Sequence, residues 1–453
     1  MFGNIKGKLK ISQGKKNVAK LSFGTLMGQG ISFVTLPIFT RIYGAEVIGI
    51  WTVLQSIAII INSFSDLGFT NALMVEKDED KILCIYKVVS SIVFIVALLS
   101  GFVLLIYYSN FNKKGVSSWF IGVFIFVAVF TLQQIQICYT WLNRNGKYQT
   151  LMKNPIINNV TFGVIGITLG LIGYKSYGYY IGWILGQFLT LIHMKKQLPN
   201  ELFTFNIEDY KYVFSKYIKF LKYQMPTNII SNFKNQLPIL CISGFYGSKI
   251  LGYYSISVKI LYIPITLLAS AVGRVFFQKT SEMKRLGQNI GNYVYKNLSD
   301  AMKIGALPMI GIMSAGDIII TVFFGELWKP AGIIIRILAL QNFFMFLMMT
   351  VQGLSITLDK QNYAMVSSVA QSIGYIFGLF IGKYVFNSIY IGVAIMGLLF
   401  VIINIIYFSM MFKVMEISPK KYLFNVLSYI LIMFAGTMII RAILLFVGLV
   451  TSI

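Results

Sequence analysis

Apolar runs of roughly 20 residues recur along the whole chain, and they constrain its fold more than any other feature. At about 1.5 Å per residue, a helix of that length crosses a hydrocarbon core about 30 Å thick. Only 12% of the residues are charged, against about 25% in soluble domains, and the sequence lacks the alternating pattern of barrel strands. We therefore expect an all-α polytopic membrane protein.

The apolar runs predict thirteen membrane spans, and counts of 12 and 14 stay open. The expected ranges are 18–42, 47–72, 83–108, 116–142, 151–172, 176–194, 217–242, 250–275, 301–324, 331–357, 361–382, 386–412 and 422–448. The expected organisation is an N-terminal lobe over residues 1–200, a C-terminal lobe over 201–412, and an extra C-terminal span within 413–453.

The formal net charge of +24 is distributed unevenly between the two predicted sides of the membrane. With the lysine-rich N-terminus inside, the inner segments hold 28 of the 39 Lys and Arg residues, and the outer loops hold 7, among them Lys113 and Lys114. This bias follows the positive-inside rule and predicts a cytoplasmic N-terminus. The excess charge thus orients the protein in its membrane, and we expect no nucleic-acid partner.

Two stretches about two hundred residues apart share one pattern. Both "LPIFTRIYGAEVIGIW" (36–51) and "LPILCISGFYGSKILGYY" (237–254) contain Leu-Pro-Ile, a Tyr-Gly turn and a later Gly followed by aromatic residues. Each closes an inside-to-outside span and opens the next, so the halves are expected to be parallel repeats. Transporters built of two such bundles place their substrate between them. The alternative is that Pro and Gly turns recur here by chance.

Several motifs resemble those of polysaccharide repeat-unit (O-antigen) flippases of the Wzx type, in the multidrug/oligosaccharidyl-lipid/polysaccharide exporter superfamily. The opening matches in Leu36-Pro37, Arg41, the Gly44–Gly49 turn and Asp66-Leu67-Gly68. The segment "LGYYSISVKILYIPITLLASAVGRVFFQKTSE" (251–282) resembles the eighth helix of the family and its following loop. The loops "WLNRNGKY" and "GLSITLDKQNY" also fit, so the resemblance covers spans 1 to 12 in order.

The resemblance implies a V-shaped fold with six helices per lobe and no enzymatic activity. It implies that the chain moves a sugar repeat unit on undecaprenyl pyrophosphate from the inner to the outer leaflet of the bacterial cytoplasmic membrane. The glycan would be O-antigen, and hence lipopolysaccharide, or another surface polysaccharide, with a polymerase and a chain-length regulator as partners. A lipid II flippase and a multidrug antiporter remain alternatives. A membrane polymerase is remote, because no outer loop is large enough or contains the acids for such chemistry.

Ionisable residues at membrane depth are costly and mark functional sites by default. Lys234 and Lys259 lie deep in the seventh and eighth spans, and either is a candidate to contact an anionic pyrophosphate. Arg336 and Arg441 lie nearer the outer ends of their spans, where snorkelling to the interface explains them, although Arg336 is also a candidate for an outer vestibule. Arg41 ends the first span and either meets substrate or anchors to headgroups.

Amide and hydroxyl side chains form two polar lines that suit sugar hydroxyls. The first line is Gln224, Asn228, Ser231, Asn232 and Asn235 in the seventh span, and the second contains Gln133 and Gln136 in the fourth. The alternative is that these groups join neighbouring helices. Asp66 is expected to cap a turn or to pair with a cation, with a weaker assignment to coupling or gating. Coupling to protons or sodium ions is left open, and neither a cofactor nor a metal site is expected.

Overall fold

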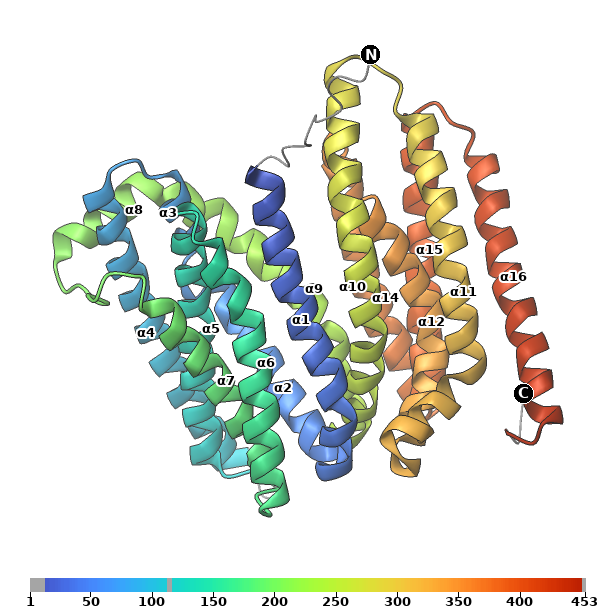
Figure 1. Ribbon diagram of the computed structural model, residues 1–453, viewed down its shortest axis with the longest axis horizontal. Helices are drawn as coiled ribbons and strands as arrows, with labels where there is room; N and C mark the ends of the chain where they lie inside the picture. The colour runs from blue at the N-terminus through green and yellow to red at the C-terminus, as the bar shows by residue number, and fades with distance from the viewer. Residues whose placement is uncertain (1–12, 112–115, 450–453) are drawn as a thin grey trace, which may run out of the picture. The chain divides into compact units, whose positions relative to one another are not determined.

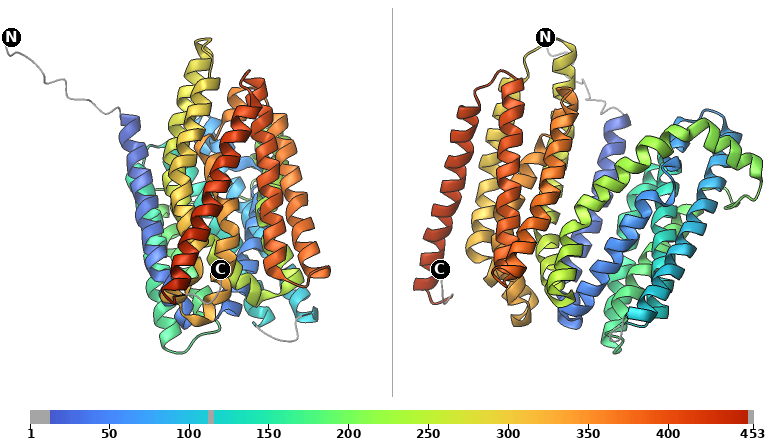
Figure 2. Two further views of the ribbon diagram at one scale, coloured as in Figure 1. Left: turned by 90° about the vertical axis from the view of Figure 1, so that its right-hand side faces the viewer. Right: turned by 180° about the vertical axis from the view of Figure 1, so that it is seen from behind.

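The computed structural model describes residues 13–111 and 116–449, and their secondary structure is helical throughout (Figure 1). The lysine-rich N-terminus, Lys113 and Lys114 of the predicted outer loop and the last residues of the chain lie outside these ranges. The long helices run alongside their neighbours within each part of the chain, as the further views show (Figure 2).

Thirteen long helices in the described residues correspond to the thirteen predicted spans. They are α1 (Gln13–Ile42), α2 (Ala45–Ser65), α4 (Glu79–Phe111), α5 (Ser118–Arg144), α6 (Tyr148–Leu171), α7 (Gly178–Lys195), α9 (Met225–Tyr246), α10 (Ser248–Arg285), α11 (Gly291–Phe324), α12 (Lys329–Thr350), α14 (Gln361–Tyr384), α15 (Ile389–Val414) and α16 (Pro419–Phe446). Ten of them are long and apolar enough to cross a membrane, and α7, α9 and α10 fall outside that group. The all-α membrane fold is confirmed, whereas the number of crossings stays a prediction.

Short elements interrupt three of the predicted spans. They are η1 (Phe69–Asn71) and α3 (Ala72–Val75), α8 (Ile207–Lys219) and η2 (Phe220–Gln224), and α13 (Leu354–Thr357); η3 (Glu326–Trp328) precedes α12. Gly68 and Gly353 have φ values of 78° and 81°, a left-handed conformation that ends the preceding helix. The spans expected to continue to residues 72 and 357 therefore end at Ser65 and Thr350.

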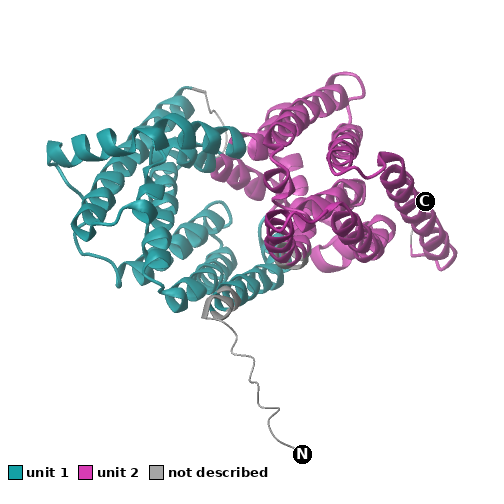
Figure 3. Cartoon of the chain, turned by 90° about the horizontal axis from the view of Figure 1, so that it is seen from above, with its two compact units in different colours: residues 1–43, 57–232 teal, residues 44–56, 233–453 magenta. Residues whose placement is uncertain are grey.

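The chain divides into two compact units (Figure 3). Unit 1 comprises residues 1–43 and 57–232, and unit 2 comprises residues 44–56 and 233–453. The helices α2 and α9 each contribute residues to both units. The predicted lobe boundaries near residues 200 and 412 remain a prediction.

Three packed pairs of helices in unit 1 have counterparts in unit 2. In unit 1, α4 packs on α5, α5 on α7 and α6 on α7. In unit 2, α11 packs on α12, α12 on α15 and α14 on α15. Counted by predicted spans, these pairs are 3–4, 4–6 and 5–6 in the first half and 9–10, 10–12 and 11–12 in the second. This correspondence supports the parallel repeat.

The repeated stretches also form equivalent contacts. Tyr43 donates a hydrogen bond of 2.6 Å to the Gly166 carbonyl on α6, and Tyr246 donates one of 2.9 Å to the Leu379 carbonyl on α14. These acceptors lie on the fifth and eleventh predicted spans. Each tyrosine therefore ties the end of its helix to the equivalent partner helix.

Gly49 and Gly252, the glycines that follow the Tyr-Gly turns of the two stretches, make a reciprocal contact within unit 2. A Cβ atom on Gly49 would lie 1.8 Å from the Ser248 carbonyl oxygen, and one on Gly252 would lie 1.9 Å from the Ala45 carbonyl oxygen. Only a residue without a side chain allows such an approach between the beginnings of α2 and α10. Glycine is thus required at both positions.

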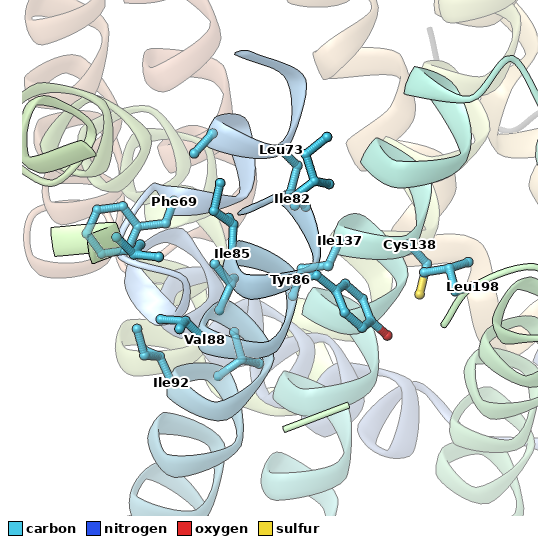
Figure 4. Close-up of a cluster of buried hydrophobic side chains, with 14 of the residues drawn as sticks. Phe69, Leu73, Ile82, Ile85, Tyr86, Val88, Ile92, Ile137, Cys138 and Leu198 are labelled. Carbon is cyan, nitrogen blue, oxygen red and sulfur yellow. The ribbon is translucent and has the colours of Figure 1, made fainter. Parts of the chain in front are cut away.

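A cluster of buried apolar side chains holds unit 1 together around α4 (Figure 4). It includes Ile85, Tyr86 and Val89 of α4 together with Ile137 of α5 and Val213 of α8, each almost completely buried. Because α8 contributes to this core, the amphipathic segment between the two halves is fixed to unit 1.

A buried carboxylate adds to this attachment. The Glu76 side chain, 5% exposed, accepts hydrogen bonds from Tyr212, Lys216 and Tyr217 of α8 at 2.7, 2.5 and 2.5 Å. The Lys216 ammonium and the two tyrosine hydroxyls hold the pKa of Glu76 well below its usual range. Arg144 of α5 donates to the Glu76 carbonyl at 2.5 Å, so three elements meet at this residue.

Candidate functional site

Lys234 of α9 stands at the centre of a polar cluster in unit 2. Its Nζ donates to Ser368 Oγ at 3.2 Å and to Gln371 Oε1 at 3.3 Å, both on α14. Among the described residues no carboxylate forms an ion pair with Lys234. The ammonium is therefore stabilised by neutral dipoles, and its positive charge is left uncompensated by any of these carboxylates.

Buried amides extend the Lys234 cluster to α15. Gln371 Nε2 donates to Ser367 Oγ at 3.1 Å and to Asn404 Oδ1 at 3.5 Å, and Asn404 Nδ2 donates to the Phe400 carbonyl at 2.7 Å. Gln371 is 5% exposed and Asn404 is completely buried. Because the amide nitrogen of Gln371 points to Asn404, its oxygen is free to face the lysine. The sequence interpretation missed this cluster, although amides in apolar spans were the available signal.

The predicted polar line in the seventh span lies at the end of η2 and along α9. Gln224 donates to Asn228 at 3.1 Å, Asn232 is half-buried, and Ser231 and Asn235 are exposed. The π-helical turn Phe220–Gln224 precedes α9, so the line begins where the helix changes its period. Gln224, Asn228 and Asn232 belong to unit 1, whereas Lys234 and Asn235 belong to unit 2.

Lys259 and Arg41 are separate from the Lys234 cluster in their bonding. Lys259 is half-buried on α10 and Arg41 is exposed at the end of α1. No hydrogen bond or ion pair among the described residues joins either one to Ser368 or Gln371. Both remain candidates for contact with an anionic substrate.

The arginines expected to snorkel form an ion-pair cluster instead. Arg441, 2% exposed, donates to both carboxylate oxygens of Asp317 at 2.9 and 2.7 Å. Arg336 Nη1 lies 3.6 Å from Asp317, and Arg336 Nε donates to the Met313 carbonyl at 2.8 Å. Pairing offsets the cost of removing these charges from water, so neither side chain needs to reach the interface. If Arg336 lines an outer vestibule, Asp317 already neutralises part of its positive charge.

The two glutamines of the predicted line in the fourth span have different surroundings. Gln133 is buried and donates to Thr70 Oγ1 at 3.4 Å, which joins α5 to η1. Gln136 is exposed. Gln133 therefore joins neighbouring elements, and Gln136 is the glutamine available to a ligand.

Asp66 caps the turn that follows α2. Its carboxylate accepts from the backbone N–H groups of Gly68 and Thr70 at 2.9 and 3.2 Å. The turn fits closely against η2, since a Cβ on Gly68 would lie 3.0 Å from the Phe220 carbonyl oxygen. The expectation that Asp66 caps a turn is confirmed, and the residue has a structural reason to be acidic.

Unit 1 contains an amide-lined cavity that the sequence interpretation missed. Its volume is about 280 Å³, and its lining includes Tyr139 of α5, Asn154, Asn158 and Asn159 of α6, and Gln187 and Thr190 of α7. Asn154 is 8% exposed, and its Oδ1 has no hydrogen-bond partner among the described residues. The lining is uncharged, so the cavity suits a neutral ligand that carries hydroxyl groups.

Comparison with known proteins identifies relatives of this chain. A family profile described as polysaccharide biosynthesis protein matches residues 38–333. Teichuronic acid biosynthesis protein TuaB of Bacillus subtilis is 26% identical over 214 residues, which cover 46% of this chain and 43% of TuaB. The probable low-salt glycan biosynthesis flippase Agl15 of Haloferax volcanii is 21% identical over 323 residues, which cover 71% of this chain and 67% of Agl15. The match to TuaB thus spans less than half of that protein.

Two solved structures share the fold. Lipid II flippase MurJ in an inward closed conformation has a TM-score of 0.68 at 16% identity, covering 94% of this chain and 97% of MurJ. An inward-facing multidrug resistance MATE transporter of the MOP superfamily has a TM-score of 0.56 at 14% identity, covering 88% of this chain and 99% of the transporter. At these identities the likeness shows the fold alone. The comparisons agree with the expectation that the chain is not an enzyme.

Proposed function

Because this chain belongs to the polysaccharide biosynthesis protein family, we propose that it is a flippase for lipid-linked glycans in the bacterial cytoplasmic membrane. It moves oligosaccharide repeat units on undecaprenyl pyrophosphate from the inner to the outer leaflet. The observation that carries this proposal is Lys234, a cation in an apolar chain that neutral hydrogen-bonding groups hold, with no carboxylate partner in the part of the chain that the structure describes.

The charge of Lys234 favours an anionic substrate. A charged side chain at the centre of a membrane helix costs about 2.5–3.5 kcal/mol, so an uncompensated lysine there calls for a function. A pyrophosphate supplies the missing negative charge. A cationic drug would instead require free acids, and two prominent carboxylates are already engaged, Asp66 in its turn and Asp317 between two arginines.

The amide groups favour a substrate rich in hydroxyls. The amides of the exposed Asn235 and Gln136 offer donors and acceptors to sugar hydroxyls, and Asn154 offers an Oδ1 that has no partner among the described residues. TuaB and Agl15 are named for the synthesis of teichuronic acid and of a glycan. Neither name specifies O-antigen. We leave the glycan open and propose its lipid linkage as the recognised feature.

Alternating access is the proposed mechanism, with the substrate headgroup passing Lys234 and, in part of the cycle, Lys259. The parallel repeat supports it, because such repeats supply two bundles that can move against each other. Coupling to protons or sodium ions, and assembly with a polymerase and a chain-length regulator, belong to the same proposal.

The test is the pool of lipid-linked intermediates in cells that lack the protein. We expect single repeat units to accumulate on undecaprenyl pyrophosphate and surface polysaccharide to disappear. The wild type and Lys234→Arg should restore the polymer, whereas Lys234→Ala at equal membrane abundance should not. Lys249→Ala, which removes an exposed lysine at the beginning of α10, is the control and should behave as wild type.

Other outcomes point to other functions. An unchanged pool with altered drug sensitivity would favour a multidrug antiporter. Accumulation of lipid II would favour a lipid II flippase. Loss of long polymer while single units persist on the outer leaflet would favour a polymerase.

A further inference from the structure

A cavity of unit 2 lies apart from the Lys234 cluster, with neither Lys234, Ser368 nor Gln371 in its lining. Its volume is about 490 Å³, and it lies among α11, α12, α15 and α16. Apolar side chains dominate its lining, among them Leu340, Leu398, Phe434 and Met438. A volume in this range is typical of pockets that bind small molecules, which run from about 300 to 1,000 Å³.

A second cavity adjoins the first at the two arginines. It has a volume of about 400 Å³, shares Ile333, Arg336 and Arg441 with the apolar cavity, and is lined in addition by polar groups that include Lys329 and Glu326. The guanidinium groups therefore stand where an apolar space and a polar space meet.

The order of residues along α12 gives this pair of cavities a direction. Lys329 begins the helix and lines the polar cavity, Arg336 lines both, and Leu340 lines the apolar one. Seven residues of helix place Arg336 about 10 Å from Lys329 along the axis. The polar cavity is thus at the helix end, and the apolar cavity lies deeper.

The charge at the junction is positive. Two guanidinium groups face the single carboxylate of Asp317, and Arg441 already engages both of its oxygens through Nη1 and Nη2. Arg336 is the weaker partner at 3.6 Å, and its side chain keeps 23% exposure. One positive charge therefore remains for a ligand, and Arg336 is the group that presents it.

Helix α16 exposes the cavity to lipid. Only 11% of the residues in the most apolar part of α16 are buried. Phe434 and Met438, which line the cavity, are 46% and 58% exposed. A membrane lipid can therefore enter from the side of α16. A soluble anion would satisfy the arginine and leave the apolar space unfilled.

We propose that these cavities bind an anionic phospholipid, with its phosphate at Arg336 and Arg441 and an acyl chain in the apolar cavity. Such a lipid would add to the packing of α16 on α11 and α15, and would join α16 to α12 as well. This site is separate from the Lys234 cluster and does not depend on the transported glycan.

The test measures lipids retained by the purified full-length protein in native mass spectrometry. The probes are phosphatidylglycerol and phosphatidylcholine with the same acyl chains. We expect one phosphatidylglycerol to be retained about tenfold more than phosphatidylcholine, and Arg336→Gln to bring this preference near parity while leaving the Arg441–Asp317 pair intact. Arg285→Gln, which changes an exposed arginine at the end of α10, should leave the preference unchanged.

A second variant separates the site from general destabilisation. Gly397 lines the apolar cavity, and a Cβ there would meet only ordinary contacts, the nearest at 3.5 Å from Gln341. Gly397→Leu should fill the cavity and lower retention of the lipid while thermal unfolding stays near that of wild type.

Several results would overturn the proposal. Equal retention of both lipids by the wild type, or an unchanged preference in Arg336→Gln, would remove the anionic lipid. Displacement of phosphatidylglycerol by inorganic phosphate would indicate a site for a free anion. Displacement at lower concentration by undecaprenyl phosphate would assign the cavity to the substrate carrier instead.

Discussion

Glu76 is a buried carboxylate whose side-chain partners, Tyr212, Lys216 and Tyr217, lie on the amphipathic helix α8. Replacing it with glutamine removes the charge that holds Lys216 and leaves the hydroxyls of Tyr212 and Tyr217 with a weaker acceptor. We expect Glu76→Gln to lower the free energy of unfolding by about 1–3 kcal/mol, the cost of disturbing a charged hydrogen bond. Thermal unfolding in detergent measures this change. Glu79→Gln, at a carboxylate with 75% exposure, is the control and should change little.

The lowered pKa of Glu76 also predicts how stability depends on pH. A carboxyl group with a depressed folded pKa stabilises the protein above its unfolded pKa of about 4.3, and this contribution is lost as the pH falls below that value. Between pH 5 and 8 the difference in stability between wild type and Glu76→Gln should therefore be constant. A difference that grows between pH 6 and 8 would contradict this assignment.

The Asp317 cluster predicts which of two variants is the less stable. Arg441→Met leaves Asp317 with Arg336, whereas Asp317→Asn leaves two guanidinium groups near each other without a counter-charge. Breaking a buried pair costs about 3–5 kcal/mol, and we expect Asp317→Asn to be the more damaging change. Thermal unfolding in nanodiscs gives the order. Arg41→Met, at an exposed position, is the control, and a reversed order would show that Arg336 is not part of the cluster.

Residue contacts of this kind were only partly predictable. Polarity and depth singled out Lys234, because a cation in an apolar run needs a reason. Its partners Ser368 and Gln371 lie 134 and 137 residues away, and no local pattern could select them. The arginines were expected to snorkel because each was judged by its distance from a helix end. The pairing with Asp317 depends on the packing of α16 against α11. No pattern in the sequence predicts that these two helices are neighbours.

At the scale of helices, the repeated glycines lead to a test of packing. Gly49→Leu or Gly252→Leu would place a side chain within 2 Å of a carbonyl oxygen on the opposite helix. We expect either variant to lose most folded protein, as measured by its elution as a single peak in detergent. Gly44→Ala is the matched control from the same turn, since nothing lies within 4 Å of a Cβ there. Wild-type folding of both leucine variants would show that the close contact is dispensable.

The two equivalent tyrosines should contribute independently to stability. Tyr43→Phe removes the hydrogen bond to the Gly166 carbonyl, and Tyr246→Phe removes the one to the Leu379 carbonyl together with a longer contact of 3.5 Å to the Ser388 carbonyl. A hydrogen bond of this kind is worth about 0.5–1.5 kcal/mol. Their acceptors lie in different units, so the effects should add in the double variant to within about 0.5 kcal/mol. Unfolding of the single and double variants checks this sum, and strong non-additivity would show that the two bonds are coupled.

The existence of the helices followed from hydropathy, whereas their interruptions did not. Hydropathy is averaged over many residues, so a short turn does not lower it enough to be noticed. The predicted spans therefore continued past the helix ends at Ser65 and Thr350. Gly68 and Gly353 carried the local signal, because glycine tolerates the left-handed conformation that ends a helix. The π-helical turn at Phe220–Gln224 and the amide cavity around Asn154 depend on packing and had no comparable signal.

For the whole molecule, the charge distribution predicts an orientation that labelling can test. Lys147 and Lys175 are exposed just outside opposite ends of α6, a helix of 24 residues and about 36 Å. In a variant without Cys84, Cys138 and Cys241, Lys175→Cys should react with an impermeant maleimide in intact cells. Lys147→Cys should react only after permeabilisation. The reverse pattern would place the N-terminus outside.

The reciprocal glycine contact makes the two repeated stretches depend on each other. Gly49 of the first stretch packs on the backbone of the second, and Gly252 of the second packs on the backbone of the first. A side chain at position 49 would clash with the Ser248 carbonyl, and a side chain at position 252 would clash with the Ala45 carbonyl. Neither glycine can therefore be exchanged without moving the other helix, and the spacing of the two stretches is fixed by one shared contact.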